Sequence, residues 1–139
     1  MAGFDLPGDT SMASGLSEVI TRRTLMAQTQ QQMTLAALGI QRYTLATGSV
    51  PKALSDLVPK YLSTVPHDHM GGGELRYRAE SASSYLLYSV GLNGQDDGGD
   101  ASPLSPDTLL LTLNEGKDFV WPKAASLKET EAYLLENRF

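Results

Sequence analysis

The chain contains no cysteine among its 139 residues. This absence excludes disulfide bonds, thiolate catalysis and cysteine-ligated zinc. Long apolar runs are also missing, since the longest, at residues 35–40, is far shorter than the ~20 residues that span a bilayer. The first residues have neither the basic flank nor the hydrophobic segment of a signal peptide. These absences predict a soluble chain, with a fragment separated from its membrane anchor as the alternative.

An excess of basic charge is missing as well. The net charge is −5, and the 11 lysine and arginine residues are scattered along the chain. Nucleic acids and anionic membrane surfaces are therefore not expected as partners. The apolar content of 41% and charged content of 19% indicate a globular protein, and the length suits a single domain.

A long helix is predicted for residues 16–46. Apolar side chains recur there at helical spacing, and no proline interrupts the segment. The seven-residue series consists of Met12, Val19, Met26, Met33 and Ile40. Thr47 and Gly48 supply a signal for the end of the helix. Residues 1–14 are small, polar and rich in turn formers, so we expect a flexible segment followed by one domain at 15–139.

The predicted helix is longer than the rest of the domain is wide. Thirty-one residues extend for about 46 Å at ~1.5 Å per residue. The remaining chain forms a body of about 25–30 Å by the usual scaling of compact domains. We therefore expect residues 33–43 to pack on the body, and the N-terminal half to project or to contact another subunit.

The predicted fold class is α+β, with the long helix packed on a small antiparallel sheet at residues 74–121. A short second helix is expected at 53–58. The expected strands are 74–80, 85–90 and 118–121, with 85–90 in the centre because both of its faces are apolar. Residues 108–113 could add a fourth strand or a short helix, and a strand is favoured. A capping box at 126–129 predicts a C-terminal helix to residue 136.

An acidic, glycine-rich loop follows the central strand and is the main candidate site. Crowded carboxylates repel one another unless water, hydrogen bonds or a cation screens them, and calcium prefers oxygen ligands. The spacing does not match the helix-loop-helix calcium motif. A calcium site and a solvated turn therefore both remain open. The candidate ligands are the carbonyl of Val90 and the side chains of Asn93, Asp96, Asp97, Asp100 and Asp118.

Two further patterns carry weaker signals. His67 and His69 flank Asp68, but they are the only histidines, and we expect their side chains to point in opposite directions from an extended segment. A turn in which Asp68 binds backbone amides is therefore favoured over a zinc or copper site. No nucleophile elbow, dinucleotide-binding loop or phosphate-binding loop is present, so no enzymatic activity is expected. A hydrolase that uses Asp96, Asp97 or Asp118 is the weakest hypothesis.

The order of several short motifs resembles the soluble part of type II secretion major pseudopilins and related type IV pilin-like proteins. The motifs are LSDLVPKYL at 54–62, VPHD at 65–68, Gly72, LRY at 75–77, YSVGLNG at 88–94 and DFVW at 118–121. The resemblance covers about residues 33–122. It implies an α+β subunit without enzymatic activity that assembles with other pilin-like subunits or secretion-system proteins. It also implies a periplasmic or cell-surface location and an N-terminal membrane anchor that is absent from this chain.

In that family a calcium ion holds the loop between the last two strands. The resemblance implies that the carbonyl of Val90, Asn93 and Asp118 are ligands, with one or more of Asp96, Asp97 and Asp100. Two departures bear on this implication: Asn93 is neutral where an aspartate is usual, and residues 101–115 form a longer insertion. The alternative function is a pilin-like binding module of a larger cell-surface protein, with recognition through the loop at 91–107.

Overall fold

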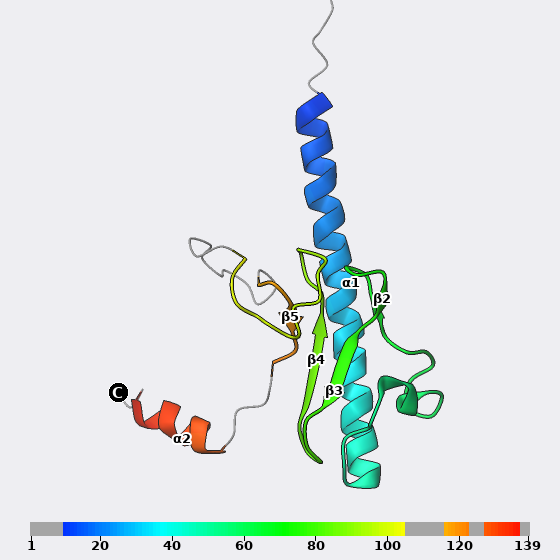
Figure 1. Ribbon diagram of the computed structural model, residues 1–139, viewed down its shortest axis with the longest axis vertical. Coiled ribbons are helices and arrows are strands. Elements are labelled where there is room, and N and C mark those ends of the chain that lie inside the picture. The colour runs from blue at the N-terminus through cyan, green and yellow to red at the C-terminus, as the bar shows by residue number, and fades with distance from the viewer. Residues whose placement is uncertain (1–9, 105–115, 123–126, 137–139) are drawn as a thin grey trace, which may run out of the picture.

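The computed structural model describes residues 10–104, 116–122 and 127–136. Figure 1 shows a long helix beside a small sheet, and these elements confirm the predicted α+β class. The elements are α1 (Thr10–Thr47), the 3₁₀ helix η1 (Leu54–Leu57), β1 (His67–Asp68), β2 (Gly73–Glu74), β3 (Arg76–Ala79), β4 (Tyr85–Ser89), β5 (Phe119–Val120) and α2 (Leu127–Glu136). The strand expected at 108–113 lies outside the described residues.

Helix α1 begins at Thr10, before the expected start at Leu16. Residues 10–14, which were expected to be flexible, are therefore helical. No proline lies within the segment to prevent the extra turn. The helix ends where Gly48 takes a φ of 84° and its N–H donates to the carbonyl of Thr44 at 2.8 Å. A left-handed glycine is a common end of a helix, and this boundary was predicted within one residue.

The three-stranded sheet has the order β3–β4–β5 and is antiparallel throughout. Tyr77 pairs with Leu87, and Ser89 pairs with Phe119. The central position of β4 confirms the interpretation of its apolar sequence. A second sheet, the hairpin of β1 and β2, was not predicted. Each of its strands has two residues, which is too short to show an alternating pattern.

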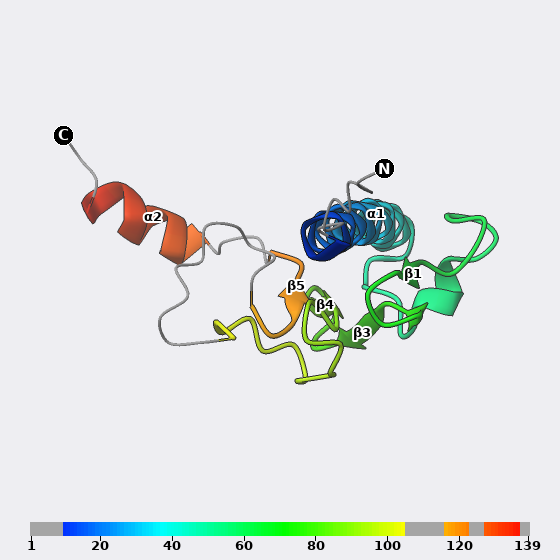
Figure 2. The same ribbon diagram turned by 90° about the horizontal axis from the view of Figure 1, so that it is seen from above.

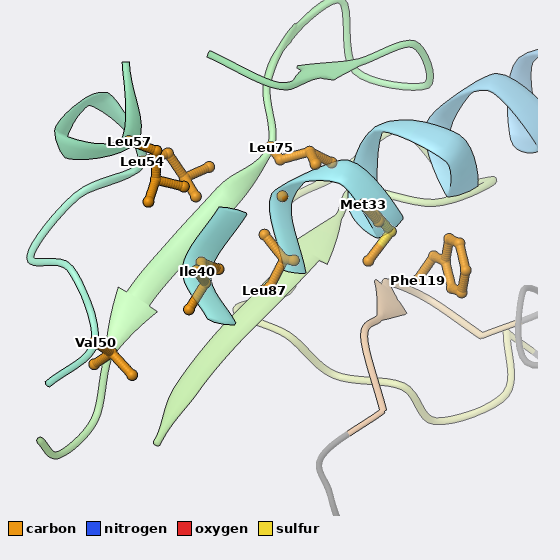
Figure 3. Packing of buried hydrophobic residues seen from close by; sticks show 9 residues of the cluster. Met33, Ile40, Val50, Leu54, Leu57, Leu75, Leu87 and Phe119 are labelled. Atoms are coloured by element: carbon orange, nitrogen blue, oxygen red, sulfur yellow. The ribbon is translucent and has the colours of Figure 1, made fainter. Parts of the chain in front are cut away.

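The core lies between the C-terminal half of α1, the sheet and η1. Figure 3 shows the side chains that meet there, and Met33 and Ile40 from α1 lie against Leu87 of β4 and Phe119 of β5. The buried cluster consists of Met33, Ala36, Ile40, Val50, Leu54, Leu57, Leu75, Leu87 and Phe119. Tyr43, Tyr77 and Trp121 are partly buried against it. Helical spacing of three, four and seven residues places the α1 members on one face.

The N-terminal half of α1 extends beyond the sheet, as Figure 1 shows. Every residue from Ala13 to Thr24 is exposed, and packing begins with half-buried Leu25 and buried Thr29. The whole helix is about 57 Å long at ~1.5 Å per residue. Among the described helices, none combines the length and apolar character that crossing a membrane requires.

Candidate functional site in the acidic loop

The acidic loop leaves the end of β4 and returns to β5. Gly91 makes the first close approach, because it has a φ of 63° and a Cβ there would lie 2.5 Å from the carbonyl oxygen of Lys117. Any other residue would be strained and would collide with backbone. The loop therefore starts from a position that only glycine suits, directly beside the chain that enters β5.

Asp118 is completely buried at the base of the loop. Its carboxylate accepts hydrogen bonds from the backbone N–H groups of Gly99 at 2.7 Å, Asp100 at 3.2 Å and Asp97 at 3.3 Å. The N–H of Asp118 also donates to the carbonyl of Asp100 at 2.9 Å. A buried carboxylate is costly unless it is hydrogen-bonded, and these donors satisfy it. The buried carboxyl group of Asp118 thus closes the loop.

Asp96 lies on the outer face of the sheet. It accepts hydrogen bonds from the hydroxyl of Tyr88 at 2.8 Å, Nε of Arg76 at 3.0 Å and the N–H of Gly98 at 3.1 Å. The bond from Tyr88 is the main cause that lowers the pKa of Asp96. Burial, followed by the bond to Asp96, raises the pKa of Tyr88 to about 12. Asp96 therefore remains an anion that fixes the loop to β3 and β4.

The remaining polar residues of the loop are also paired within it. Nδ2 of Asn93 donates to Asp97 at 2.7 Å, and the ammonium group of Lys117 lies 3.0 Å from Asp100. Hydrogen bonds from Ser102, together with Lys117, lower the pKa of Asp100 to about 2. The side chain of Asp100 is 41% exposed, so its ion pair contributes little to stability.

The structure brings the expected calcium ligands into one loop, where the described carboxylates have hydrogen-bond or ion-pair partners within the protein. Their described oxygens face amide groups, an arginine and a lysine, and the N–H of Val90 donates to Asp68 at 3.1 Å. Within the described part of the chain, no three acidic or histidine side chains are placed to hold a metal ion together. The calcium site remains a prediction from the resemblance.

Asp68 is a second buried aspartate whose full role the sequence did not reveal. Its carboxylate accepts hydrogen bonds from the hydroxyl of Ser89 at 2.8 Å and from the N–H groups of Met70 at 2.9 Å and Val90 at 3.1 Å. The predicted bonding to backbone amides is confirmed at Met70. The bonds to Ser89 and Val90 join the β1–β2 turn to the end of β4, where the acidic loop starts.

His67 and His69 do not point in opposite directions, so that expectation was wrong. Their rings meet edge to face, with centroids 4.9 Å apart. The reason is that residues two apart in an extended strand lie on the same face, so the expectation misapplied the alternation of side chains. Their backbone N–H groups donate to Gln32 and Thr29 of α1, each at 3.2 Å. The pair thus ties the hairpin to the helix.

A groove with a volume of about 490 Å³ lies beside the loop. It is lined by Arg78, Glu80, Leu86, Gly98, Gly99, Ala101, Val120, Trp121 and Pro122. Because Leu87 faces α1, its neighbour Leu86 faces the other side of the sheet. The groove therefore lies on the face that α1 leaves uncovered. The sequence suggested the loop at 91–107 as a recognition surface but not the contribution of Arg78 and Leu86.

Comparison of the chain with models of known protein families, with curated proteins and with solved structures finds no match in any of the three.

Proposed function

We propose that this chain is a non-enzymatic assembly subunit of the pilin-like type. In this proposal it packs against other copies or related secretion-system subunits, in the periplasm or at the cell surface. The observation that carries the proposal is the projecting half of α1, in which Ala13 to Thr24 are all exposed. A helix that extends past its own domain presents side chains that no described part of the chain covers.

The projecting half has the composition of a contact surface. Leu16, Val19 and Ile20 are 63%, 48% and 57% exposed. Their spacing of three and four residues places them on one side of the helix. Full burial of such side chains is worth about 1.5–3 kcal/mol each. Contact with a partner helix would therefore bury these side chains and stabilise the assembly.

The acidic loop supports a structural role instead of a catalytic one. A general acid or base must be free to exchange a proton with a substrate. Asp118 is buried and accepts three backbone hydrogen bonds, and Asp96 is held by Tyr88, Arg76 and Gly98. These carboxylates close the loop and fix it to the sheet. The order of β4, loop and β5 also agrees with the pilin-like resemblance.

Cysteine cross-linking tests the assembly role cleanly, because the chain has no cysteine of its own. Ile20→Cys places a thiol on the exposed apolar side, and Thr21→Cys places one on the same turn about 100° away. Oxidation should produce disulfide-linked dimers of Ile20→Cys and leave Thr21→Cys monomeric. Equal yields from the two variants, together with a monomer at all concentrations in sedimentation, would contradict the proposal.

The groove beside the loop favours a second candidate function, the binding module of a larger surface protein. It combines apolar Leu86 and Val120 with the aromatic ring of Trp121 and the charges of Arg78 and Glu80. Such a mixture suits a peptide or glycan. Trp121 is the only tryptophan, so its fluorescence reports on the groove. A saturable change in Trp121 fluorescence on addition of a peptide or glycan from a library would favour this function. Calorimetry should then show that the Trp121→Phe variant no longer binds that ligand.

A further inference from the structure

His67 and His69 form a close pair of imidazole rings that the proposed function does not use. His67 opens β1 and is exposed, and His69 follows the strand and is half-buried. From the sequence, a metal site was disfavoured here because these side chains were expected to point apart. Residues two apart in an extended segment lie on the same face, and the rings do meet. The structure therefore removes that objection.

The separation of the two rings suits the binding of one metal ion by both. Zinc, as an example, binds an imidazole nitrogen at ~2.0–2.1 Å. The centre of the ring lies about 1.1 Å beyond that nitrogen, so two rings at neighbouring square-planar or tetrahedral positions of one ion have centroids roughly 4.5–5.2 Å apart. The centroids of His67 and His69 are 4.9 Å apart.

The orientation of the rings can adjust without movement of the backbone. The rings meet edge to face, with an interplanar angle of 74°. To bind one ion, a nitrogen of each ring must face a common point. The χ2 torsion of histidine is broad, and its axis passes close to the ring centre. Rotation about χ2 therefore turns the nitrogens while the separation of the centroids stays nearly the same.

Helix α1 holds the backbone of both histidines in place. The N–H of His67 donates to Oε1 of Gln32, and the N–H of His69 donates to Oγ1 of Thr29, each at 3.2 Å. Figure 2 shows β1 beside α1, in agreement with these bonds. Ligands that are positioned before the ion arrives lose less conformational freedom when it binds. The pair is therefore partly preorganised.

Asp68 lies between the two histidines but is occupied elsewhere. Its buried carboxylate accepts hydrogen bonds from Ser89, Met70 and Val90. Within the described residues, no third histidine or acidic side chain completes a cluster with the pair. An ion held by two imidazoles therefore keeps coordination positions for water or for a group of another molecule.

We propose that His67 and His69 together bind one divalent late transition metal ion, of the group that includes copper, nickel and zinc. Imidazole suits these metals, whereas calcium and magnesium prefer oxygen ligands. The affinity should be greatest for Cu²⁺, which leads the usual order for nitrogen ligands and accepts mixed nitrogen and oxygen donors. The site uses none of the acidic-loop residues, and it does not depend on the assembly role.

Calorimetric titration of the full chain with Ni²⁺ alone, in a buffer that does not bind metals, tests the proposal. The wild type should bind one ion per chain. His67→Gln and His69→Gln should each weaken binding by at least ~10–100-fold, the range for loss of a group that only supports a ligand. Circular dichroism checks that the variants remain folded.

The matched control is the double variant His69→Gln/Gln41→His, which keeps two histidines but places them on different elements. Gln41 is exposed, and it lies about 13.5 Å along α1 from Gln32, the partner of His67. One ion cannot reach both imidazoles across that distance. The control should therefore bind Ni²⁺ no more tightly than His69→Gln.

Several results would overturn the proposal. These are equal affinity of the wild type and the matched control, two independent ions per chain, and a wild type without saturable binding. A second measurement needs no substitution: in a Zn²⁺ titration followed by NMR, the ring protons of His67 and His69 should shift with one common midpoint at one equivalent. A shift of one ring alone would show that the pair does not share an ion.

Discussion

The two halves of α1 are built from similar residues but meet different surroundings. Ile20 in the projecting half is 57% exposed, whereas Ile40 in the packed half is 1% exposed. Both belong to apolar stripes with helical spacing. The packed stripe contributes to the domain core, and the projecting stripe is free for a partner. An apolar stripe in a helix therefore predicts that this face is buried against something, but it does not predict which partner buries it.

The acidic loop repeats this contrast with carboxylates. Asp118 is buried and accepts three backbone hydrogen bonds, whereas Asp100 is exposed and pairs with Lys117. The two residues contact each other through the backbone and differ in their access to water and in their partners. Substitutions at these matched positions should therefore have very different effects.

The largest effect is expected for the pair of isoleucines. Ile40→Ala removes buried methyl groups and leaves a cavity, so the free energy of unfolding should fall by about 2–5 kcal/mol. Ile20→Ala should change it by less than about 0.5 kcal/mol, because that side chain is exposed. Urea unfolding at low protein concentration measures both. Equal losses would mean that the projecting half is covered within one chain, and the comparison would fail.

The next effect concerns Asp118. Asp118→Ala leaves three loop N–H groups without their acceptor, and the free energy of unfolding should fall by roughly 3 kcal/mol. Asp97→Ala is the control, because Asp97 accepts a side-chain bond from Asn93 near the surface. It should cost less than about 1 kcal/mol. The same urea titration measures both variants, and a larger loss for Asp97 would contradict the assignment of Asp118 as the centre of the loop.

Added calcium gives a further test of the acidic loop, because the predicted ion would bind Asp118. An ion that binds only the folded chain, present at about 100 times its dissociation constant, adds about 2.7 kcal/mol to stability. If the resemblance holds, calcium should add this stability to the wild type and should add none to the Asp118→Asn variant. If hydrogen bonds alone hold the loop, the thermal midpoint should be the same with added calcium and with a chelator. Thermal unfolding under both conditions decides, and identical midpoints would remove the calcium prediction.

The smallest effect concerns the exposed member of the pair. The pKa of Asp100 is lowered from 3.8 to about 2 in the folded chain. A carboxyl group whose folded pKa is depressed stabilises the fold above its unfolded pKa, and this contribution is lost as the pH falls through the folded pKa. Thermal midpoints of the wild type should therefore decline between pH 3.8 and about 2. The decline should be shallower in Asp100→Asn, and parallel curves would contradict the pKa shift.

Local patterns in the chain were sufficient for the main elements. The spacing of Met33 and Ile40 predicted the packed face of α1, and the apolar run of β4 predicted the central strand. The length of the helix relative to the domain predicted that one end projects. These features depend on the periodicity of apolar residues and on the length of the helix, and both can be read from residues that are close together in the sequence. The start of α1 was placed too late because Thr10, Ser11 and Ser14 are weaker helix formers and were given more weight than Met12 and Ala13.

Features that join distant segments required the tertiary structure. Asp68 meets Ser89 and Val90 only after the β1–β2 hairpin forms, and no pattern near Asp68 indicates these partners. The loop acids crowd together in the sequence, and folding gives each a partner: amide groups for Asp97 and Asp118, Arg76 and Tyr88 for Asp96, and Lys117 for Asp100. The sequence by itself determined which segments are helical, extended or acidic, because those properties are local. Which carboxylate loses its water, and which distant groups it meets, was decided by packing, because both depend on what the folded chain brings alongside.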